Sequence, residues 1–175
     1  KESNKSKYQL EKIVRMTKLT MLVLSRQLAA GDFEPSFFEK SFGERDNLEA
    51  LNIELKNNAK MYLRGKIDRV DTYVDEDKTL VKIIDYKTGN MKWELDMPFY
   101  GRALQLVIYL DAVMEQLTKE GKEVLPAAFF YYHIDSPFLT RDEAKKENAF
   151  LSKLKPMGIV NTDFNIIKHL DKSIE

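Results

Sequence analysis

The chain has 175 residues, which suits one domain with a substantial core. Its 28 basic and 28 acidic residues give no net charge, so contact with nucleic acid would need a local basic patch. Cysteine is absent and only two histidines occur, which excludes thiolate sites and disfavours a histidine-rich zinc centre. A metal bound here should therefore be a hard ion held by oxygen, such as Mg²⁺, Mn²⁺ or Ca²⁺.

A long helix is predicted first, because residues at spacings of three and four form an apolar stripe expected to face the core. They are Leu10, Val14, Thr17, Met21, Leu24 and Leu28. Gly31 stands where a glycine often follows a helix, and Pro35 prevents its continuation. Two modest strands are predicted next, over residues 37–43 and 51–55, with a charged turn at residues 44–47 between them.

A hairpin at the centre of a sheet is predicted from the following segment. Residues 61–71 alternate in polarity, residues 81–86 form a β-branched run, and residues 75–78 form the turn between them. Pro98 can then open a helix that ends near Lys119. Between residues 103 and 113 this helix is apolar almost all round, which predicts that it is buried.

The last third of the chain is predicted to hold an aromatic strand at residues 126–134, a charged helix at 141–154 and a final helix or turn at 165–174. The order of elements predicts a single α/β domain over residues 1–175, in which helices flank a central mixed sheet. No signal peptide or membrane span is found in the sequence. We therefore expect a cytoplasmic protein with no membrane partner, cut from a longer chain.

Two aspartates and a lysine on the predicted hairpin are the candidate catalytic residues. Asp85 and Lys87 are two positions apart on an extended chain, so their side chains share one face of the sheet. If the two strands pair, Asp68 and Asp85 can converge on one ion. The alternative is a solvated ion pair on an edge strand, which would contribute little.

These residue types suit the hydrolysis of a phosphodiester. That reaction needs an ion that polarises the phosphate and activates water, and Mg²⁺ is held by one or two carboxylates. Lys87 could orient the nucleophile or stabilise the negative charge of the transition state. The main-chain carbonyl of Tyr86, which lies between Asp85 and Lys87, could add one more oxygen ligand.

Gln105 and Tyr109 are a polar pair in the apolar helix, and their spacing of four points both side chains the same way. They could support the site or bind DNA, although a structural hydrogen bond is the better explanation of the pair alone. Glu39 is a weaker candidate for the metal site, and a solvated strand carboxylate is favoured there. Lys66, Arg69 and Lys92 could contact phosphates, although such charges are usually solvated.

Three motifs in this order resemble the PD-(D/E)XK nuclease superfamily, in its RecB-like branch. They are Gly65-Lys66-Ile67-Asp68, Asp85-Tyr86-Lys87 and Gln105-Leu106-Val107-Ile108-Tyr109. Longer stretches around them, together with residues 126–134 and 155–160, resemble the nuclease domain of the AddB (RexB) family of bacterial helicase–nucleases. The likeness covers most of the chain.

The resemblance implies that Asp68 and Asp85 are metal ligands, that Lys87 is catalytic, and that Gln105 and Tyr109 position DNA or support the site. It also implies a DNA exonuclease that processes double-strand breaks beside an AddA-type helicase–nuclease subunit. RecB-like nucleases usually carry a His or Glu in a helix before the first strand. Because His133 and His169 come too late in the chain, we expect that helix upstream of Lys1.

AddB-type domains often hold an iron–sulfur cluster with four cysteines that lie outside the nuclease core. Since this chain has no cysteine, such a cluster would belong to the parent protein. Two alternatives to the AddB-type exonuclease remain open. One is an inert nuclease-fold module that binds DNA or the partner subunit, and the other is a stand-alone RecB-like exonuclease.

Overall fold

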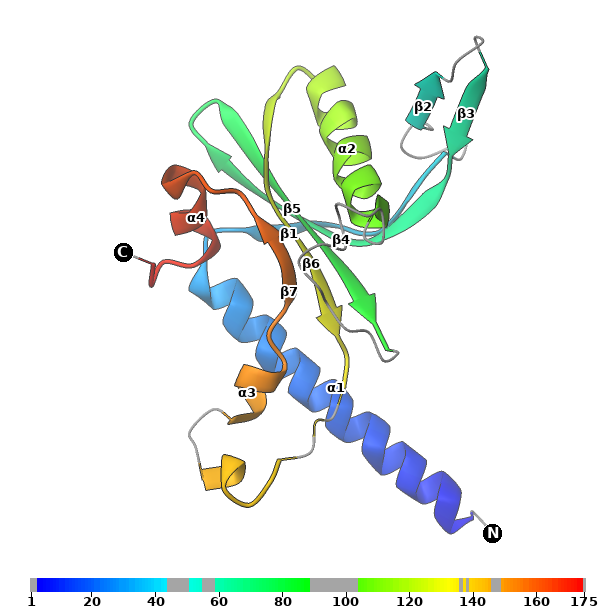
Figure 1. Ribbon diagram of the computed structural model, residues 1–175, viewed down its shortest axis with the longest axis vertical. Helices are drawn as coiled ribbons and strands as arrows, with labels where there is room; N and C mark the ends of the chain where they lie inside the picture. The colour runs from blue at the N-terminus through cyan, green and yellow to red at the C-terminus, as the bar shows by residue number, and fades with distance from the viewer. Residues whose placement is uncertain are drawn as a thin grey trace.

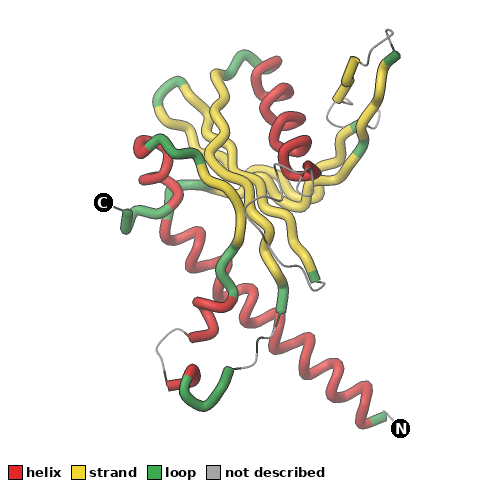
Figure 2. The backbone as a smooth tube through the Cα atoms, viewed as in Figure 1, coloured by secondary structure: helices red, strands yellow, loops and turns green. Residues whose placement is uncertain are grey.

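The computed structural model describes residues 3–43, 51–54, 59–88, 104–135, 137, 139–145 and 149–174. Within them, five strands form one sheet in the order β1-β4-β5-β6-β7, and β2 and β3 form a separate pair (Figures 1 and 2). The strands are β1 Glu34–Phe42, β2 Leu51–Glu54, β3 Lys60–Leu63, β4 Gly65–Asp75, β5 Lys78–Lys87, β6 Glu123–His133 and β7 Met157–Val160. The helices are α1 Asn4–Ala30, α2 Leu104–Lys119, the 3₁₀ turn η1 Glu143–Lys145, α3 Ala149–Lys153 and α4 Phe164–Leu170.

The five-stranded sheet is mixed, as the sequence predicts. β4 and β5 form the central antiparallel hairpin, and β1 and β7 add antiparallel strands at the two edges. β5 and β6 run parallel. A parallel pair needs a long crossover, and α2 lies within the connection between these two strands. The predicted α/β architecture is confirmed.

Alternate residues of β5 pack against different helices. Val81 and Ile83 join a core cluster with α2 side chains, whereas Ile84 packs with Val23 of α1 and Leu154. We call the face of Val81 and Ile83 the front face, and the face of Ile84 the back face. α2 thus covers the front face, and α1 and the segment around α3 cover the back face (Figure 1).

The predicted apolar stripe of α1 is largely wrong. Leu10, Val14 and Met21 are exposed, whereas Leu19 and Val23 pack on the back face together with Leu24. The helix has 27 residues and is therefore about 40 Å long, so its first half extends beyond the sheet (Figure 1). Burial along α1 is set by where the sheet ends as well as by the helical period.

Burial along α2 follows one side of the helix. Leu106, Tyr109 and Val113 are buried against the sheet, but Val107 is 40% exposed, so the expected all-round burial is wrong. The helix ends at Lys119, as predicted. Pro98 and the predicted turn at residues 44–47 lie outside the described residues.

Three further elements differ from the expectations. The predicted strand 61–71 is divided at Arg64 between β3 and β4, which belong to different sheets. The predicted helix 141–154 contains η1 and α3, with residues 146–148 not described. β7 was not predicted at all, because four residues are too few to show a period. None of the helices in the described ranges has both the length and the apolar character needed to cross a bilayer.

Candidate active site

The β4–β5 hairpin brings the three predicted catalytic residues together. The register pairs Arg69 with Ile84, and this is the last backbone pair of the two strands on that side. Asp68 and Asp85 come next along the two neighbouring strands, with β6 on the other side of β5. Asp85 and Lys87 alternate with Ile84 and therefore share the front face with Ile83.

The carboxylate of Asp85 is buried, and its ion pair with Lys87 offsets only part of the cost of burying its charge. Asp85 is 3% exposed, and its Oδ2 is ion-paired with Nζ of Lys87 at 2.6 Å. Burial raises the pKa of Asp85, Lys87 partly offsets the rise, and the negative charge of Asp68 adds to it. A second cation beside this carboxyl group would therefore stabilise its ionised form.

Asp68 is half-buried and is held by the neighbouring strand. Its Oδ2 accepts a hydrogen bond of 2.7 Å from the main-chain N–H of Tyr86. Here a side chain takes the place of the backbone partner that an antiparallel ladder would otherwise offer. The carboxylate of Asp68 is thereby tied to the backbone between Asp85 and Lys87.

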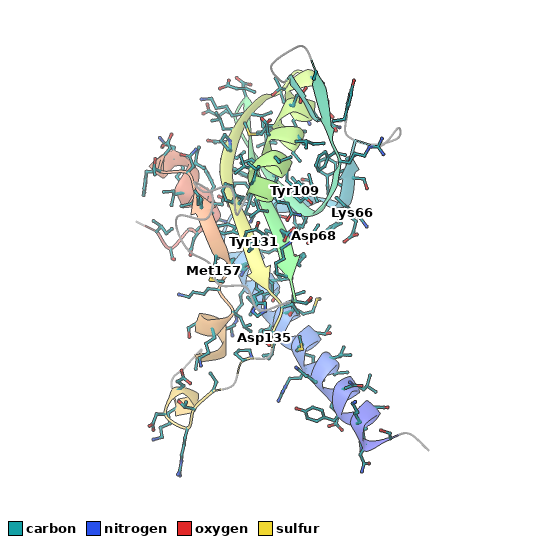
Figure 3. All side chains as sticks on the ribbon, turned by 45° about the vertical axis from the view of Figure 1, so that its right-hand side comes forward. Lys66, Asp68, Tyr109, Tyr131, Asp135 and Met157 are labelled. Atoms are coloured by element: carbon teal, nitrogen blue, oxygen red, sulfur yellow. The ribbon has the colours of Figure 1, made fainter. Side chains whose placement is uncertain are left out.

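Tyr131 is a site residue that the sequence analysis missed. It lies opposite Asp85 on β6, and Nζ of Lys87 is 5.5 Å from the centre of its ring. Figure 3 labels Tyr131 and Asp68. Burial raises the pKa of Tyr131, and Asp85 and Tyr109 raise it further. The aromatic run at residues 126–134 predicted a strand, but its register against β5 could not be read from the sequence.

Gln105 and Tyr109 do contact each other. Nε2 of Gln105, which is exposed, donates a hydrogen bond of 2.6 Å to the hydroxyl of the buried Tyr109. The Tyr109 ring packs edge-on against Phe42, with ring centres 5.4 Å apart. A Cβ atom at Gly65 would lie 2.5 Å from the Phe42 ring and 2.8 Å from the Tyr109 ring. Gly65 therefore allows α2 to approach the first residues of β4 closely.

The weaker candidates take different places. Glu39 has a positive φ of 53° and is ion-paired with Lys66, with both side chains more than half exposed. Arg69 is only 3% exposed, so the expectation that it is solvated or contacts phosphate is wrong. It is occupied on the back face by Asp71, to which it donates two hydrogen bonds. Lys92 lies outside the described residues.

The donors at the site fit a hard divalent ion. Within the described ranges no three His, Cys, Asp or Glu side chains gather as a metal site, and Asp68 and Asp85 are the carboxylates that the described residues bring together here. Mg²⁺ and Mn²⁺ suit such a site, because they accept a few carboxylate oxygens and complete their shell with water and substrate oxygens. α1 precedes β1 but packs on the back face, so the expected upstream His or Glu stays a prediction.

Comparison with known proteins agrees with the motifs and the fold. Residues 1–167 match the family model of the PD-(D/E)XK nuclease superfamily. The chain belongs to this superfamily.

Individual relatives show which members of the superfamily this chain resembles. The B-type ATP-dependent helicase/deoxyribonuclease subunit of Thermoanaerobacter sp. (strain X514) is 38% identical over 99% of this chain and 16% of its own length. The protein of the same name from Clostridium tetani (strain Massachusetts / E88) is 39% identical, and that from Clostridioides difficile (strain 630) is 34% identical, each over 98% of this chain and 15% of its own. The chain thus spans about a sixth of these relatives, and the predicted resemblance to the AddB-type subunit is confirmed.

Proposed function

We propose that this chain is the nuclease domain of an AddAB-type helicase–nuclease and hydrolyses DNA phosphodiester bonds with Mg²⁺ or Mn²⁺. The observation that carries the proposal is the meeting of Asp68, Asp85 and Lys87 at the end of the central hairpin. A solvated ion pair would not explain why the partner of Lys87, Asp85, is almost completely buried and close enough to a second carboxylate, that of Asp68, for its pKa to be raised by it.

Each residue has a separate role in this proposal. Asp68 and Asp85 hold the metal ion, and the carbonyl oxygen of Tyr86 is the candidate for one further ligand. The ion, when bound, supplies polarisation of the phosphate and a lower pKa for water. Lys87 is one-third exposed and lies beside the carboxylates, so its ammonium group can stabilise negative charge on the phosphate oxygens. Tyr131 limits the positions of Lys87 from the side of β6.

Gln105 and Tyr109 would shape the DNA-binding side of the site. Tyr109 is packed into the core, whereas Gln105 is exposed at the start of α2 and can reach substrate. We assign Tyr109 to support of the site and Gln105 to contact with DNA. Glu39 is occupied by Lys66 and remains the weakest metal candidate.

The wider role is proposed from the relatives. Their names describe a subunit of an ATP-dependent helicase/deoxyribonuclease, which supports DNA as the substrate and an AddA-type subunit as the partner. In this proposal the activity serves the processing of double-strand breaks. An iron–sulfur cluster, if the parent protein holds one, would use cysteines outside this chain.

The test of function uses the full-length protein with its partner subunit, with any nuclease site of that partner inactivated. Cleavage of linear duplex DNA is compared for wild type and Lys87→Ala at saturating Mg²⁺, and DNA binding is measured in Ca²⁺. We expect binding to be nearly unchanged and cleavage to fall by a hundredfold or more, or about 3 kcal/mol, because the charge of Lys87 acts on the transition state. Cleavage of Lys87→Ala at the wild-type rate would contradict the assignment. A wild type that binds DNA but never cuts it would favour the inert module.

A further inference from the structure

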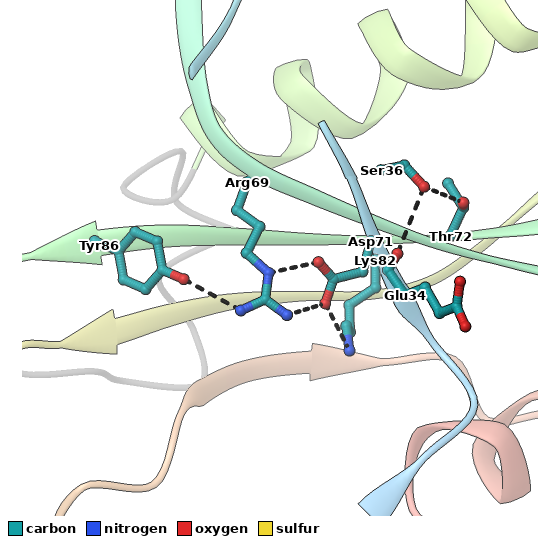
Figure 4. Close-up of polar contacts among 7 residues, drawn as sticks. All are labelled: Glu34, Ser36, Arg69, Asp71, Thr72, Lys82 and Tyr86. Carbon is teal, nitrogen blue, oxygen red and sulfur yellow. Dashed lines mark hydrogen bonds and ion pairs between the residues drawn. The ribbon is translucent and has the colours of Figure 1, made fainter. Parts of the chain in front are cut away.

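The residues that directly follow the two site aspartates meet on the back face of the hairpin. Arg69 follows Asp68 on β4, and Tyr86 follows Asp85 on β5. Nη1 of Arg69 donates a hydrogen bond of 3.3 Å to the hydroxyl of Tyr86 (Figure 4). A contact between these two side chains therefore joins the strands directly behind the carboxylates.

This contact lies where the backbone ladder has stopped. The register of β4 and β5 ends at the pair Arg69 and Ile84. Beyond that pair, the bond from the Tyr86 N–H to Asp68 joins the strands on the front, and the bond from Arg69 to the Tyr86 hydroxyl joins them on the back. At this end of the hairpin, these two side-chain bonds join β4 directly to β5, while the backbone pairs of β4 with β1 and of β5 with β6 continue.

Arg69 is itself firmly held. Its Nε and Nη2 donate to the two carboxylate oxygens of Asp71 at 2.5 and 2.6 Å, and Nζ of Lys82 lies 3.0 Å from the second oxygen (Figure 4). Asp71 is fully buried, and Arg69 and Lys82 are 3% and 7% exposed. Such a two-pronged pair fixes the plane of the guanidinium group. The Tyr86 hydroxyl is therefore bound to a rigid donor.

We propose that Arg69 and the Tyr86 hydroxyl are positioning residues for the metal site. They hold β5 against β4 from the back, so that Asp68 and Asp85 keep the separation that suits one ion. A cation on Asp68 competes for the carboxylate that accepts from the Tyr86 N–H, and the back-face bond then keeps the strands together. This inference rests on the proposed function of the same aspartates.

The closest matched pair of variants removes one hydroxyl group from neighbouring tyrosines. Tyr86→Phe deletes the acceptor of the Arg69 bond. Tyr132→Phe is the control, because Tyr132 lies beside Tyr86 in the β5–β6 register and packs edge-on against it at 6.0 Å, whereas its hydroxyl makes no bond to Arg69 among the described residues. Both variants keep the aromatic ring and its packing.

In the full-length complex, we expect Tyr86→Phe to weaken Mn²⁺ binding, measured by calorimetric titration, about fivefold, the factor that corresponds to roughly 1 kcal/mol. The Mn²⁺ concentration for half-maximal cleavage should rise by the same factor. Saturating Mn²⁺ should restore most of the rate, because the catalytic groups are all present. Tyr132→Phe should leave the Mn²⁺ dependence unchanged even if its melting temperature falls as far as that of Tyr86→Phe. A merely structural hydroxyl would lower stability without changing the Mn²⁺ dependence.

Arg69→Lys gives a second measurement from the other end of the bond. Lysine keeps the positive charge beside Asp71 but cannot bind two carboxylate oxygens and the Tyr86 hydroxyl together. We expect it to raise the half-maximal Mn²⁺ concentration as well. Because both changes break one bond, the double variant with Tyr86→Phe should show less than the sum of the two effects.

Asp85→Ala distinguishes a failure of the proposed function from a failure of the positioning role. If Asp85→Ala cleaves with wild-type Mn²⁺ dependence, the proposed function fails. If Asp85→Ala abolishes cleavage while Tyr86→Phe and Tyr132→Phe have the same Mn²⁺ dependence, the site stands and the positioning role is overturned. A fivefold shift confined to Tyr86→Phe and Arg69→Lys supports both.

Discussion

The front and back faces of the β4–β5 hairpin differ in how cations balance their buried carboxylates. On the back face, one carboxylate, that of Asp71, is shared by two cations, and both of its oxygens are bonded. On the front face, the buried carboxylate of Asp85 is ion-paired with one described cation, Lys87, and the negative charge of Asp68 opposes that pairing. The same residue types on the same strands thus give one carboxylate two cations on the back face, and leave Asp85 with one described cation and an opposing carboxylate on the front face.

A structural ion cluster and a functional one differ in whether a further cation would stabilise their buried carboxylates. A buried carboxylate with all its oxygens bonded gains nothing from a further cation. A buried carboxylate with a raised pKa and a second carboxylate beside it is stabilised when a divalent ion arrives. The back face should therefore govern the stability of the fold, and the front face should govern metal binding and rate.

The largest stability effect should come from Asp71→Ala. This change leaves Arg69 and Lys82 buried without their carboxylate, which typically costs about 3–5 kcal/mol. Asp85→Ala is the matched control on the front face, because Lys87 is one-third exposed and can turn to solvent. Thermal or urea unfolding would measure both variants, and equal destabilisation would contradict the comparison.

Gly65→Ala should lower both the stability of the fold and the rate of cleavage. The added methyl group would collide with the rings of Phe42 and Tyr109, and such overpacking typically costs about 1–3 kcal/mol. Because Tyr109 must move, the rate of cleavage per folded molecule should also fall. Unfolding curves and cleavage rates at equal folded concentration would test this, and an unchanged melting temperature would show that the rings yield easily.

Gln105→Ala should have the smallest effect on stability. The side chain is exposed, so its loss removes one hydrogen bond to Tyr109 and leaves no large cavity. We expect DNA binding or cleavage to weaken while the melting temperature hardly changes. A clear fall in melting temperature with normal cleavage would instead make the pair structural, because the buried hydroxyl had lost its partner.

Sequence reasoning succeeded where geometry is local. The common face of Asp85 and Lys87 follows from strand alternation, and the contact of Gln105 with Tyr109 follows from the helical period. The pairing of the two strands that carry Asp68 and Asp85 follows from the short turn at Glu76 and Asp77. Each of these features depends on a few neighbouring positions.

Burial and strand register that depend on distant segments could not be predicted from the sequence. Arg69 and Lys82 resemble ordinary solvated charges in the sequence, and only the covering of the back face buries them; Lys82 lies 4.8 Å from the ring centre of Phe33. The place of Tyr131 beside Asp85 depends on the register of a parallel strand that arrives after a crossover. Which part of α1 is buried depends on where the sheet ends.

The most direct test of the central claim is a calorimetric titration of the full-length protein with Mn²⁺, in the wild type and in Asp85→Ala. We expect one binding event in the wild type that is lost or greatly weakened in Asp85→Ala, because the proposed ion is held between Asp68 and Asp85 through oxygen ligands. Equal Mn²⁺ affinity in the two proteins would contradict the assignment of the metal site.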